Sequence, residues 1–490
     1  MSDVDAAIDA ALRPFADALS AFVFYAVPVL GTDVPLVVVW LVVAAVFATV
    51  YLRFVCVTGF AEALRLVTGR GATHGDDPSG EVSHFQALAT AVSGTVGVGN
   101  IAGVAVAISA GGPGAAFWMA LAGVLGMSSK FAECTLGVLY RTEHADGSVS
   151  GGPMYYLERG LGARGFPRLG RALGRFYAAG IVVGCLGIGN MFQSNQAYVQ
   201  LVGVTGGDAS WFAQRGWLVG LVLAAIVGAV VFGGIRSIAR VTARVVPAMA
   251  AFYLAFGFAA LAMNAEALPW ALGAILDGAF TSEGVAGGAL GAVVVGFQRA
   301  VFSNEAGLGS ATIAHAAVRT ARPVTEGFVA LLEPFIDTVV ICSTTALVVI
   351  TTEYYDPTFA DGLDGIAITS RAFERNFAGA PYLIAIAASL FALSTMISWA
   401  YYGQKGWGYL LGGLEGRIRP GAERVFQAVF CLFVALGCTI RLDAVLDFSD
   451  ALVFVICIPN IVALYVLAPE VRRELEAYRA HRRSPGPPAR

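Results

Sequence analysis

The apolar stretch at residues 89–108, ATAVSGTVGVGNIAGVAVAI, constrains this chain most, because it is long enough for a membrane helix and yet rich in glycine. Glycine costs about 1 kcal/mol relative to alanine inside a helix, and four glycines fall within residues 93–103. Backbone amides and carbonyls freed in hydrocarbon are costly unless something pairs with them. The stretch therefore predicts a membrane helix that breaks where it lines a cavity or holds a ligand.

A second segment of the same kind lies two hundred residues later, at residues 296–312, GFQRAVFSNEAGLGSAT. The motif NIAG at 100–103 is echoed by NEAG at 304–307, which suggests an internal repeat. Paired glycine-interrupted membrane segments in two halves of a chain are the best sequence pointer to a transporter binding site.

Composition assigns the class of protein. The chain is 57% hydrophobic and only 13% charged, with a mean hydropathy of +0.72, whereas soluble domains are roughly 25% charged. These values predict an all-α polytopic membrane protein. The seven cysteines are scattered and no His/Cys cluster occurs, so we interpret them as small apolar side chains. Nothing in the sequence indicates an enzyme or a nucleic-acid partner.

Runs of about twenty apolar residues predict eleven transmembrane helices. Residues 265–282 are less apolar and predict a surface helix. The expected organisation is an N-terminal interfacial segment at 1–33, an extra transmembrane helix at 34–58, a first five-helix repeat at 84–263, a second at 284–468 and a basic tail at 469–490.

The basic residues predict the orientation of the chain. With eleven spans, 23 lysines and arginines fall on one side of the membrane and five on the other. The positive-inside rule then places the C-terminus in the cytoplasm and the N-terminus outside, in a multi-pass cell-membrane protein. The two broken segments enter from opposite sides, which is the five-plus-five inverted repeat of LeuT-type transporters, here preceded by one extra helix.

Several longer motifs in the same order resemble the alanine or glycine:cation symporter family. They are FQAL at 85–88, VGVGNIAG at 96–103, KFAECT at 130–135, GGPMYY at 151–156, FSNEAG at 302–307, AHAA at 314–317, LEPFID at 332–337 and WAYYGQK at 399–405. The chain departs from the family pattern at Gln404, where the family usually has Glu, and at Val98, where it commonly has Thr. The resemblance implies a sodium-coupled symporter that imports small neutral amino acids, such as alanine or glycine, by alternating access.

A zwitterionic amino acid suits the ends of broken helices. Free amides at a half-helix N-terminus favour a carboxylate, and freed carbonyls favour ammonium and Na⁺. The resemblance implies a substrate site formed by Thr95, Gly97, Gly99, Asn100, Gln193, Phe302, Ser303, Asn304 and Trp399. Bulky walls around a glycine-lined cleft favour alanine and glycine over larger substrates. The alternatives are close helix packing for the glycines, backbone pairing for the asparagines and ordinary core packing for the aromatic side chains.

The same resemblance implies a site for the co-transported Na⁺. It would use the carbonyls of Ser93 and Val96 with the hydroxyls of Ser394 and Thr395. The alternative is that both hydroxyls bond to their own helix backbone.

Charged residues within the expected spans are expensive there and usually face a cavity or a partner. Lys130 and Glu133 lie one helical turn apart and are expected to pair. Glu333 and Asp337 share a helix face, and at least one is expected to meet Arg299 or a backbone group. A proton relay through such carboxylates, or uncoupled transport, is the alternative to sodium coupling. A membrane enzyme or a channel is a third hypothesis, for which the sequence shows no nucleophile or metal cluster.

Overall fold

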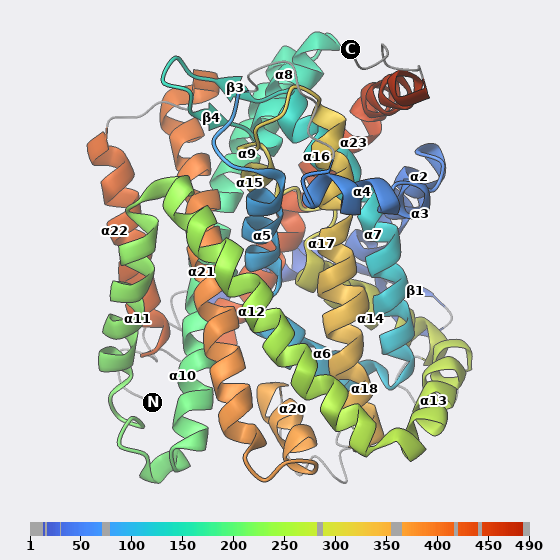
Figure 1. The fold of residues 1–490 in the computed structure, drawn as a ribbon, viewed down its shortest axis with the longest axis vertical. Coiled ribbons are helices and arrows are strands. Elements are labelled where there is room, and N and C mark those ends of the chain that lie inside the picture. Colours follow the sequence, from blue (N-terminus) through green and yellow to red (C-terminus); the bar gives the residue numbers. More distant parts are fainter. Residues whose placement is uncertain are drawn as a thin grey trace.

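The computed structural model shows an elongated bundle in which most helices run along the long axis (Figure 1). It describes residues 13–14, 17–29, 31–70, 79–281, 288–353, 365–415, 420–439 and 443–483. Of the interfacial segment expected over 1–33, residues 1–12, 15–16 and 30 lie outside the described residues. The described part is helical apart from two short hairpins, which confirms the predicted all-α class.

The first described elements precede the first broken helix. They are β1 (Ala26–Val29), β2 (Thr32–Pro35), α2 (Leu36–Tyr51), α3 (Val55–Thr58) and α4 (Phe60–Val67). The helix expected over 34–58 is therefore shorter than predicted. Pro35, which lacks an amide hydrogen, caps α2 at its start. At the other end Arg53 and Phe54 adopt left-handed φ angles of 55° and 56°, and the chain turns there before α3.

The elements of the first half follow in chain order. They are α5 (His84–Thr95), η1 (Val98–Asn100), α6 (Ala102–Gly111), α7 (Gly114–Leu139), β3 (Thr142–Glu143), β4 (Val149–Ser150), α8 (Pro153–Ala163), α9 (Pro167–Leu186), the π-helical turn η2 (Gly187–Phe192), α10 (Gln193–Val204), η3 (Gly207–Ala209), α11 (Gly216–Val231), α12 (Gly234–Met263), η4 (Ala265–Ala267) and α13 (Leu268–Phe280).

The second half has a similar sequence of helices. They are α14 (Gly288–Asn304), α15 (Thr312–His315), α16 (Pro323–Ala330), α17 (Leu332–Pro334), the π-helical turn η5 (Phe335–Cys342), α18 (Ser343–Thr351), α20 (Gly365–Glu374), α21 (Ala380–Gly412), η6 (Gly413–Glu415), α22 (Pro420–Gly437) and α23 (Asp443–Arg483).

Among the described residues, six helices are long and apolar enough to cross a membrane. The bent pair formed by α5 and the segment η1–α6 qualifies as a seventh. The helices α2 and α11 are also apolar but shorter. The chain is therefore a multi-pass membrane protein, and the number of eleven spans stays a prediction.

Both expected breaks are present, and the two broken segments run in opposite directions. The chain bends by 63° between α5 and the segment η1–α6. The second broken segment leaves the helix after α14 and becomes helical again at α15. Figure 1 draws α5 above α6 but α15 above α14, so the chain passes the two breaks in opposite senses. This is the arrangement that an inverted repeat requires.

Glycine supplies the backbone geometry of the second break. Gly307 and Gly309 have φ angles of 93° and 81°, which side chains rarely tolerate. Between them and α14, Glu305 also has a positive φ of 56°. This non-glycine strain costs about 1–3 kcal/mol and is common at ligand sites.

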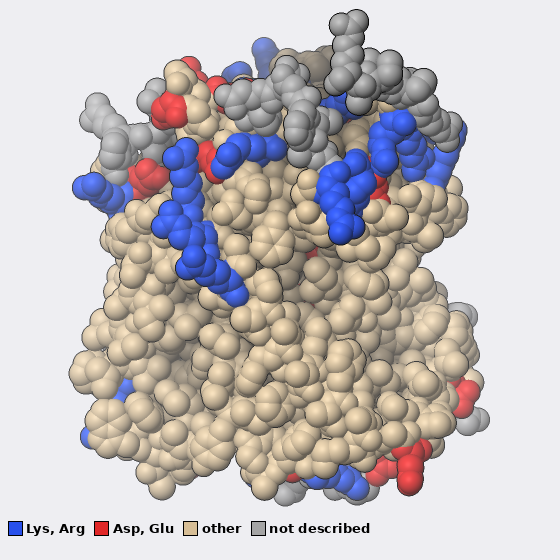
Figure 2. Space-filling view, viewed as in Figure 1, with Lys and Arg blue, Asp and Glu red and all other residues tan. Residues whose placement is uncertain are grey.

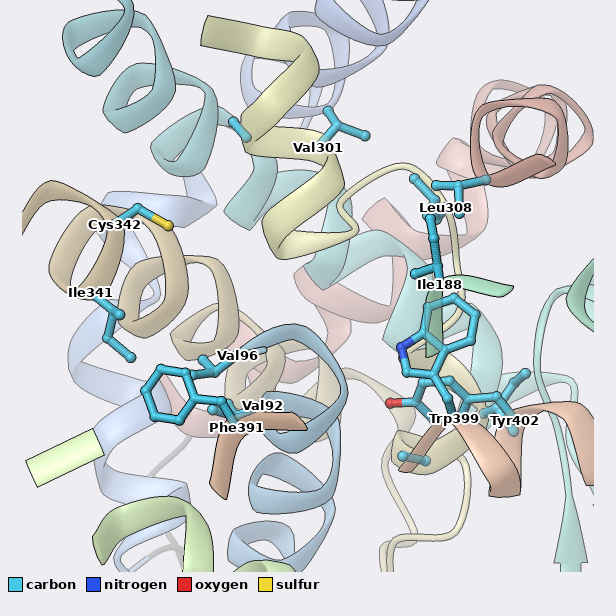
Figure 3. Packing of buried hydrophobic residues seen from close by; sticks show 14 of the residues in the cluster. Val92, Val96, Ile188, Val301, Leu308, Ile341, Cys342, Phe391, Trp399 and Tyr402 are labelled. Carbon is cyan, nitrogen blue, oxygen red and sulfur yellow. The ribbon is translucent and has the colours of Figure 1, made fainter. Parts of the chain in front are cut away.

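Helix α21 supports the first break through aromatic side chains. Figure 3 shows Phe391 of α21 beside Val92 and Val96. Trp399, further along α21, lies next to Ile188 of η2. Trp399 approaches η2 so closely that a Cβ at Gly189 would lie 2.2 Å from its Cγ atom. The core thus holds α5, η2 and α21 together around the break.

Charge is distributed unevenly along the bundle. Figure 2 shows a broad uncharged belt, with Lys and Arg gathered at the upper end of this face, the end at which α8 lies in Figure 1. This distribution agrees with the loop count made from the sequence, and the orientation of the termini stays a prediction.

Candidate functional site

The first break exposes backbone groups that polar side chains meet. The carboxamide oxygen of Asn100 accepts a hydrogen bond from the amide of Gly97 at 2.9 Å. The Oε1 atom of Gln193 accepts one from the amide of Val98 at 3.2 Å. Two residues predicted from the sequence, Asn100 and Gln193, therefore meet the amides released by the break.

Two glycines of this break lie close to side chains, and at Gly97 a side chain would not fit. A Cβ at Gly97 would lie 2.8 Å from the Thr395 hydroxyl and 3.2 Å from Gln193 Oε1. A Cβ at Gly99 would lie 3.5 Å from the ring of Phe302. Close approach of backbone to polar groups, rather than helix packing alone, explains Gly97. Gly99 faces the aromatic wall that the sequence predicts.

The predicted sodium ligands are brought together in part. The Thr395 hydroxyl lies 3.1 Å from the Ser93 carbonyl and 3.5 Å from the Val96 carbonyl. The Ser394 hydroxyl instead donates to the Phe391 carbonyl at 2.9 Å. Three oxygens from α21 and the end of α5 thus converge, and this all-oxygen donor set fits a hard cation. The Ser394 hydroxyl follows the alternative of bonding to its own helix.

A carboxylate joins the two breaks. Asp337, on the π-helical turn η5, accepts hydrogen bonds from the Asn100 carboxamide at 2.6 Å and from the Ser303 hydroxyl at 2.7 Å. Thr338 donates to the same carboxylate at 2.7 Å and accepts from the Asn304 carboxamide at 2.9 Å. Asp337 thereby holds Asn100 and Ser303, and its neighbour Thr338 holds Asn304. The sequence did not reveal these partners. The π-turn places the carboxylate there, and such turns recur at functional sites.

The observed partners of the Glu333 and Asp337 carboxylates differ from those expected from the sequence. The sequence predicts that Glu333 or Asp337 meets Arg299 or a backbone group. In the described part of the chain both carboxylates contact other side chains instead, and the Arg299 guanidinium lies over the Phe302 ring, 5.9 Å from its centroid, so this prediction is wrong. Phe302 itself also meets Phe192 edge to face at 6.3 Å. Phe302 therefore has one aromatic and one cationic neighbour in addition to Gly99.

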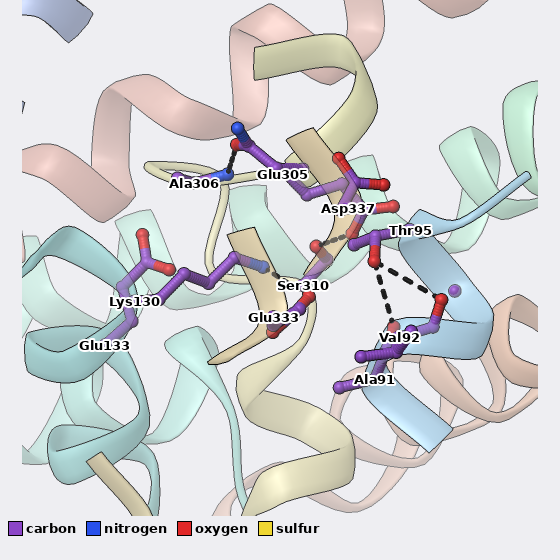
Figure 4. A network of polar contacts seen from close by, with 12 residues as sticks. Ala91, Val92, Thr95, Lys130, Glu133, Glu305, Ala306, Ser310, Glu333 and Asp337 are labelled. Atoms are coloured by element: carbon purple, nitrogen blue, oxygen red, sulfur yellow. Dashed lines mark hydrogen bonds and ion pairs between the residues drawn. The ribbon is translucent and has the colours of Figure 1, made fainter. Parts of the chain in front are cut away.

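The expected pair between Lys130 and Glu133 is also wrong. Lys130 donates to Glu333 Oε1 at 2.9 Å, and both side chains are fully buried (Figure 4). Glu333 Oε2 lies 3.6 Å from His315, whose other ring nitrogen is 2.5 Å from Glu326. A charge on one helix is here met by a charge on another helix rather than by the residue one turn away. The pairing connects α7, α15, α16 and α17.

Glu133 has a different role, which the sequence did not suggest. Its Oε1 atom accepts hydrogen bonds from the Gly307 amide at 2.9 Å and from Asn460 at 2.7 Å. Asn460 also donates to the Gly307 carbonyl at 2.8 Å. These contacts hold the second break against α7 and α23. A lone asparagine in the apolar run at 451–468 was the signal that could have identified Asn460.

Two predicted substrate residues, Thr95 and Trp399, contact backbone carbonyls of helix α5. The Thr95 hydroxyl lies 3.4–3.5 Å from the Val92 and Ala91 carbonyls of its own helix (Figure 4). Trp399 is 1% exposed and donates its indole N–H to the Gly94 carbonyl at 3.2 Å. Trp399 therefore packs against the broken helix α5 and stabilises it through the Gly94 carbonyl.

Comparisons with known proteins identify relatives that cover most of the chain. The sequence is 38% identical to the sodium/alanine symporter AgcS of Methanococcus maripaludis over 452 residues, which cover 92% of this chain and 95% of that protein. It is 31% identical to the probable sodium/glutamine symporter GlnT of Bacillus subtilis, over 90% of this chain and 87% of that protein. It is 32% identical to the amino-acid carrier protein AlsT of the same organism, over 86% and 84%.

The match extends beyond single relatives. Residues 18–488, which are nearly the whole chain, match the sequence model of one family of membrane transporters. With two oppositely directed broken helices, polar groups gathered at both breaks and this match along the sequence, the chain belongs to the sodium:alanine symporter family.

Proposed function

We propose that this protein imports small neutral amino acids together with Na⁺ by alternating access. Its family makes it a cation-coupled amino-acid transporter. The finer assignment, of Na⁺ as the coupling ion and alanine or glycine as the substrate, is supported chiefly by one observation. The Thr395 hydroxyl on α21 meets two carbonyls of the broken helix α5, those of Ser93 and Val96.

The proposed cation site explains how the ion and the substrate are coupled. Na⁺ held by Thr395 and the two carbonyls would tie α21 to the end of α5. The next residues along the chain are Gly97 and Val98, whose amides donate to Asn100 and Gln193 in this structure. The substrate carboxylate is proposed to replace these two side chains as the acceptor. Ion binding would order the same backbone that binds the substrate, so each ligand would raise the affinity for the other.

The proposed substrate site has little room for a side chain. Gly97 is close to Thr395 and Gln193, and Gly99 faces the Phe302 ring. A carboxylate on the amides of the break would direct the substrate Cα toward this wall. A methyl group fits such a space better than a longer chain, although a relative is named for glutamine. Phe302 is therefore the proposed determinant of substrate size.

One observation favours a second candidate, proton coupling. Among the described residues, no Lys, Arg or His nitrogen lies within 4.0 Å of the carboxyl oxygens of Glu133, Glu305 or Asp337. Carboxylates buried without a cation are costly and bind protons more readily. The proton would then replace Na⁺ as the driving ion.

Uptake of radiolabelled alanine into proteoliposomes distinguishes the two candidates. An inward Na⁺ gradient at equal pH should drive accumulation, and a K⁺ gradient of the same size should not. An inward proton gradient without Na⁺ should produce no accumulation. Accumulation driven by protons alone would reject sodium coupling, and inhibition by unlabelled glycine but not by unlabelled glutamine would support the proposed size limit.

A further inference from the structure

Three arginines form a continuous exposed stripe on helix α12. Arg236, Arg240 and Arg244 are spaced by four residues, so they lie on one face of the helix. All three are exposed, and the side chain of Arg236 is 70% exposed. At 1.5 Å per residue, the stripe spans about 12 Å along the helix axis.

The same face becomes apolar further along the helix. The exposed residues after Arg244 include Ala248, Ala251, Ala255 and Phe258, and Phe258 is 56% exposed. Figure 2 shows a column of Lys or Arg side chains that descends from the upper rim into the uncharged belt. In the same view, Figure 1 draws the first part of α12 at that place. The change from arginine to alanine and phenylalanine on one lipid-facing stripe marks the boundary between lipid headgroups and acyl chains.

The protein offers these arginines few negative charges. The Nε atom of Arg236 lies 4.0 Å from Glu81, which is a weak contact. Within the described part of the chain, no carboxylate lies within 4.0 Å of Arg240 or Arg244. Guanidinium groups bind phosphate in a bidentate manner. At the depth of the headgroups, the anion available to them is the phosphate of a lipid.

We propose that α12 binds the phosphodiester headgroup of an anionic phospholipid along Arg236, Arg240 and Arg244. The acyl chains of this lipid lie along the apolar continuation of the stripe. The assignment does not depend on which amino acid or ion the protein transports. Binding also draws Arg236 away from Glu81, because the phosphate offers a closer partner than the carboxylate at 4.0 Å.

The opposite face of α12 contacts helices of the proposed transport site, so a lipid bound to α12 can influence that site. Thr242 shares a hydrogen bond of 3.0 Å with Thr90 on the first broken helix. The sulfur of Met249 lies 3.4 Å from the hydroxyl oxygen of Ser394, beside the proposed cation site. A lipid that fixes α12 therefore restrains α5 and α21 as well, and anionic lipid raises the transport rate or the thermal stability of the protein.

Binding of single lipids to the purified full-length protein tests the proposal. Phosphatidylglycerol and phosphatidylcholine are titrated in detergent and the bound lipid is counted by native mass spectrometry. Phosphatidylglycerol should bind more tightly than phosphatidylcholine. Replacing all three arginines in R236Q/R240Q/R244Q should weaken phosphatidylglycerol binding by roughly fivefold per arginine, about a hundredfold in all.

A matched variant removes the same charge elsewhere. Arg168, Arg171 and Arg175 are exposed on α9, and Arg171 pairs with Glu158. The variant R168Q/R171Q/R175Q should keep most of the phosphatidylglycerol affinity. An equal loss in both triple variants would show general attraction between opposite charges and would overturn the assignment of a site.

A competition experiment and a lysine variant test the site further. Inorganic phosphate at millimolar concentration should not displace the lipid, and displacement would assign the stripe to a soluble anion instead. If the glutamine variant fails to fold, R236K/R240K/R244K retains the cytoplasmic charge but loses the bidentate geometry. It should bind phosphatidylglycerol several-fold more weakly than the native protein, and unchanged binding would overturn the proposal.

Discussion

Replacing Thr395 by valine tests the proposed cation site most directly. Valine keeps the branched shape of threonine and removes only the hydroxyl, which lies 3.1 Å from the Ser93 carbonyl and 3.5 Å from the Val96 carbonyl. One of the three oxygens proposed to hold the ion is lost. An interaction of this kind with a charged group is worth about 1.5–3 kcal/mol. The Na⁺ concentration for half-maximal uptake should therefore rise by roughly 10- to 100-fold.

The assay is initial-rate uptake of alanine into proteoliposomes across a series of Na⁺ concentrations. Thr395→Ser retains the hydroxyl and should stay within about threefold of the native protein. Ser394→Ala removes a hydroxyl that donates to the Phe391 carbonyl at 2.9 Å, and it should also have a small effect. The contrast between these neighbouring residues comes from the structure, since the sequence predicts both as ligands.

Two results would refute this reasoning. A Thr395→Val protein that folds normally and keeps the native sodium dependence would remove Thr395 from the ion site. An equally large effect of Ser394→Ala would mean that its hydroxyl leaves the Phe391 carbonyl to bind the ion. Size-exclusion profiles and melting temperatures of the purified variants separate these effects from misfolding.

Three further predictions concern the supporting structure. Gly189→Ala would place a Cβ 2.2 Å from Trp399 and should lower stability by about 1–3 kcal/mol. Gly203→Ala on α10, with nothing within 4 Å of the added Cβ, should instead keep or slightly raise the melting temperature, because alanine favours a helix over glycine. Lys130→Met leaves the buried Glu333 with His315 at 3.6 Å but without its closer cation, and should destabilise the protein by about 3–5 kcal/mol; the additional change Glu333→Gln should restore much of that loss, and additive losses would contradict the pairing. Asp337→Asn weakens the contacts to both breaks and should raise the KM for alanine about tenfold, while a flattened pH profile of uptake would instead favour proton coupling.

The sequence alone was enough to predict the class of fold and the position of both breaks. A low content of charged residues forces the chain into helices that satisfy their own backbone in the membrane. Glycines within those helices mark where the backbone opens. These are local properties, since helix length and glycine position do not depend on what packs against them. Asn100 and Gln193 came instead from the resemblance to the family, and both side chains meet amides of the first break.

The partners of the charged residues could not be read from the sequence. Lys130 lies one turn from Glu133, yet it pairs with Glu333 on another helix. Asp337 meets Asn100 and Ser303 because the π-helical turn η5 directs its carboxylate toward both breaks. Spacing along one helix predicts only contacts within that helix, and the packing of separate helices selects the others.

The identity of the chain as a transporter with two broken helices was thus determined by its sequence, through hydropathy and glycine placement. Only the tertiary structure decided which side chains gather at the breaks. It turned the Thr395 hydroxyl toward the first break and the Ser394 hydroxyl away from it, although the two are neighbours on α21. The physical reason is that adjacent residues on a helix point about 100° apart, so the way α21 packs against α5 determines which one faces the carbonyls.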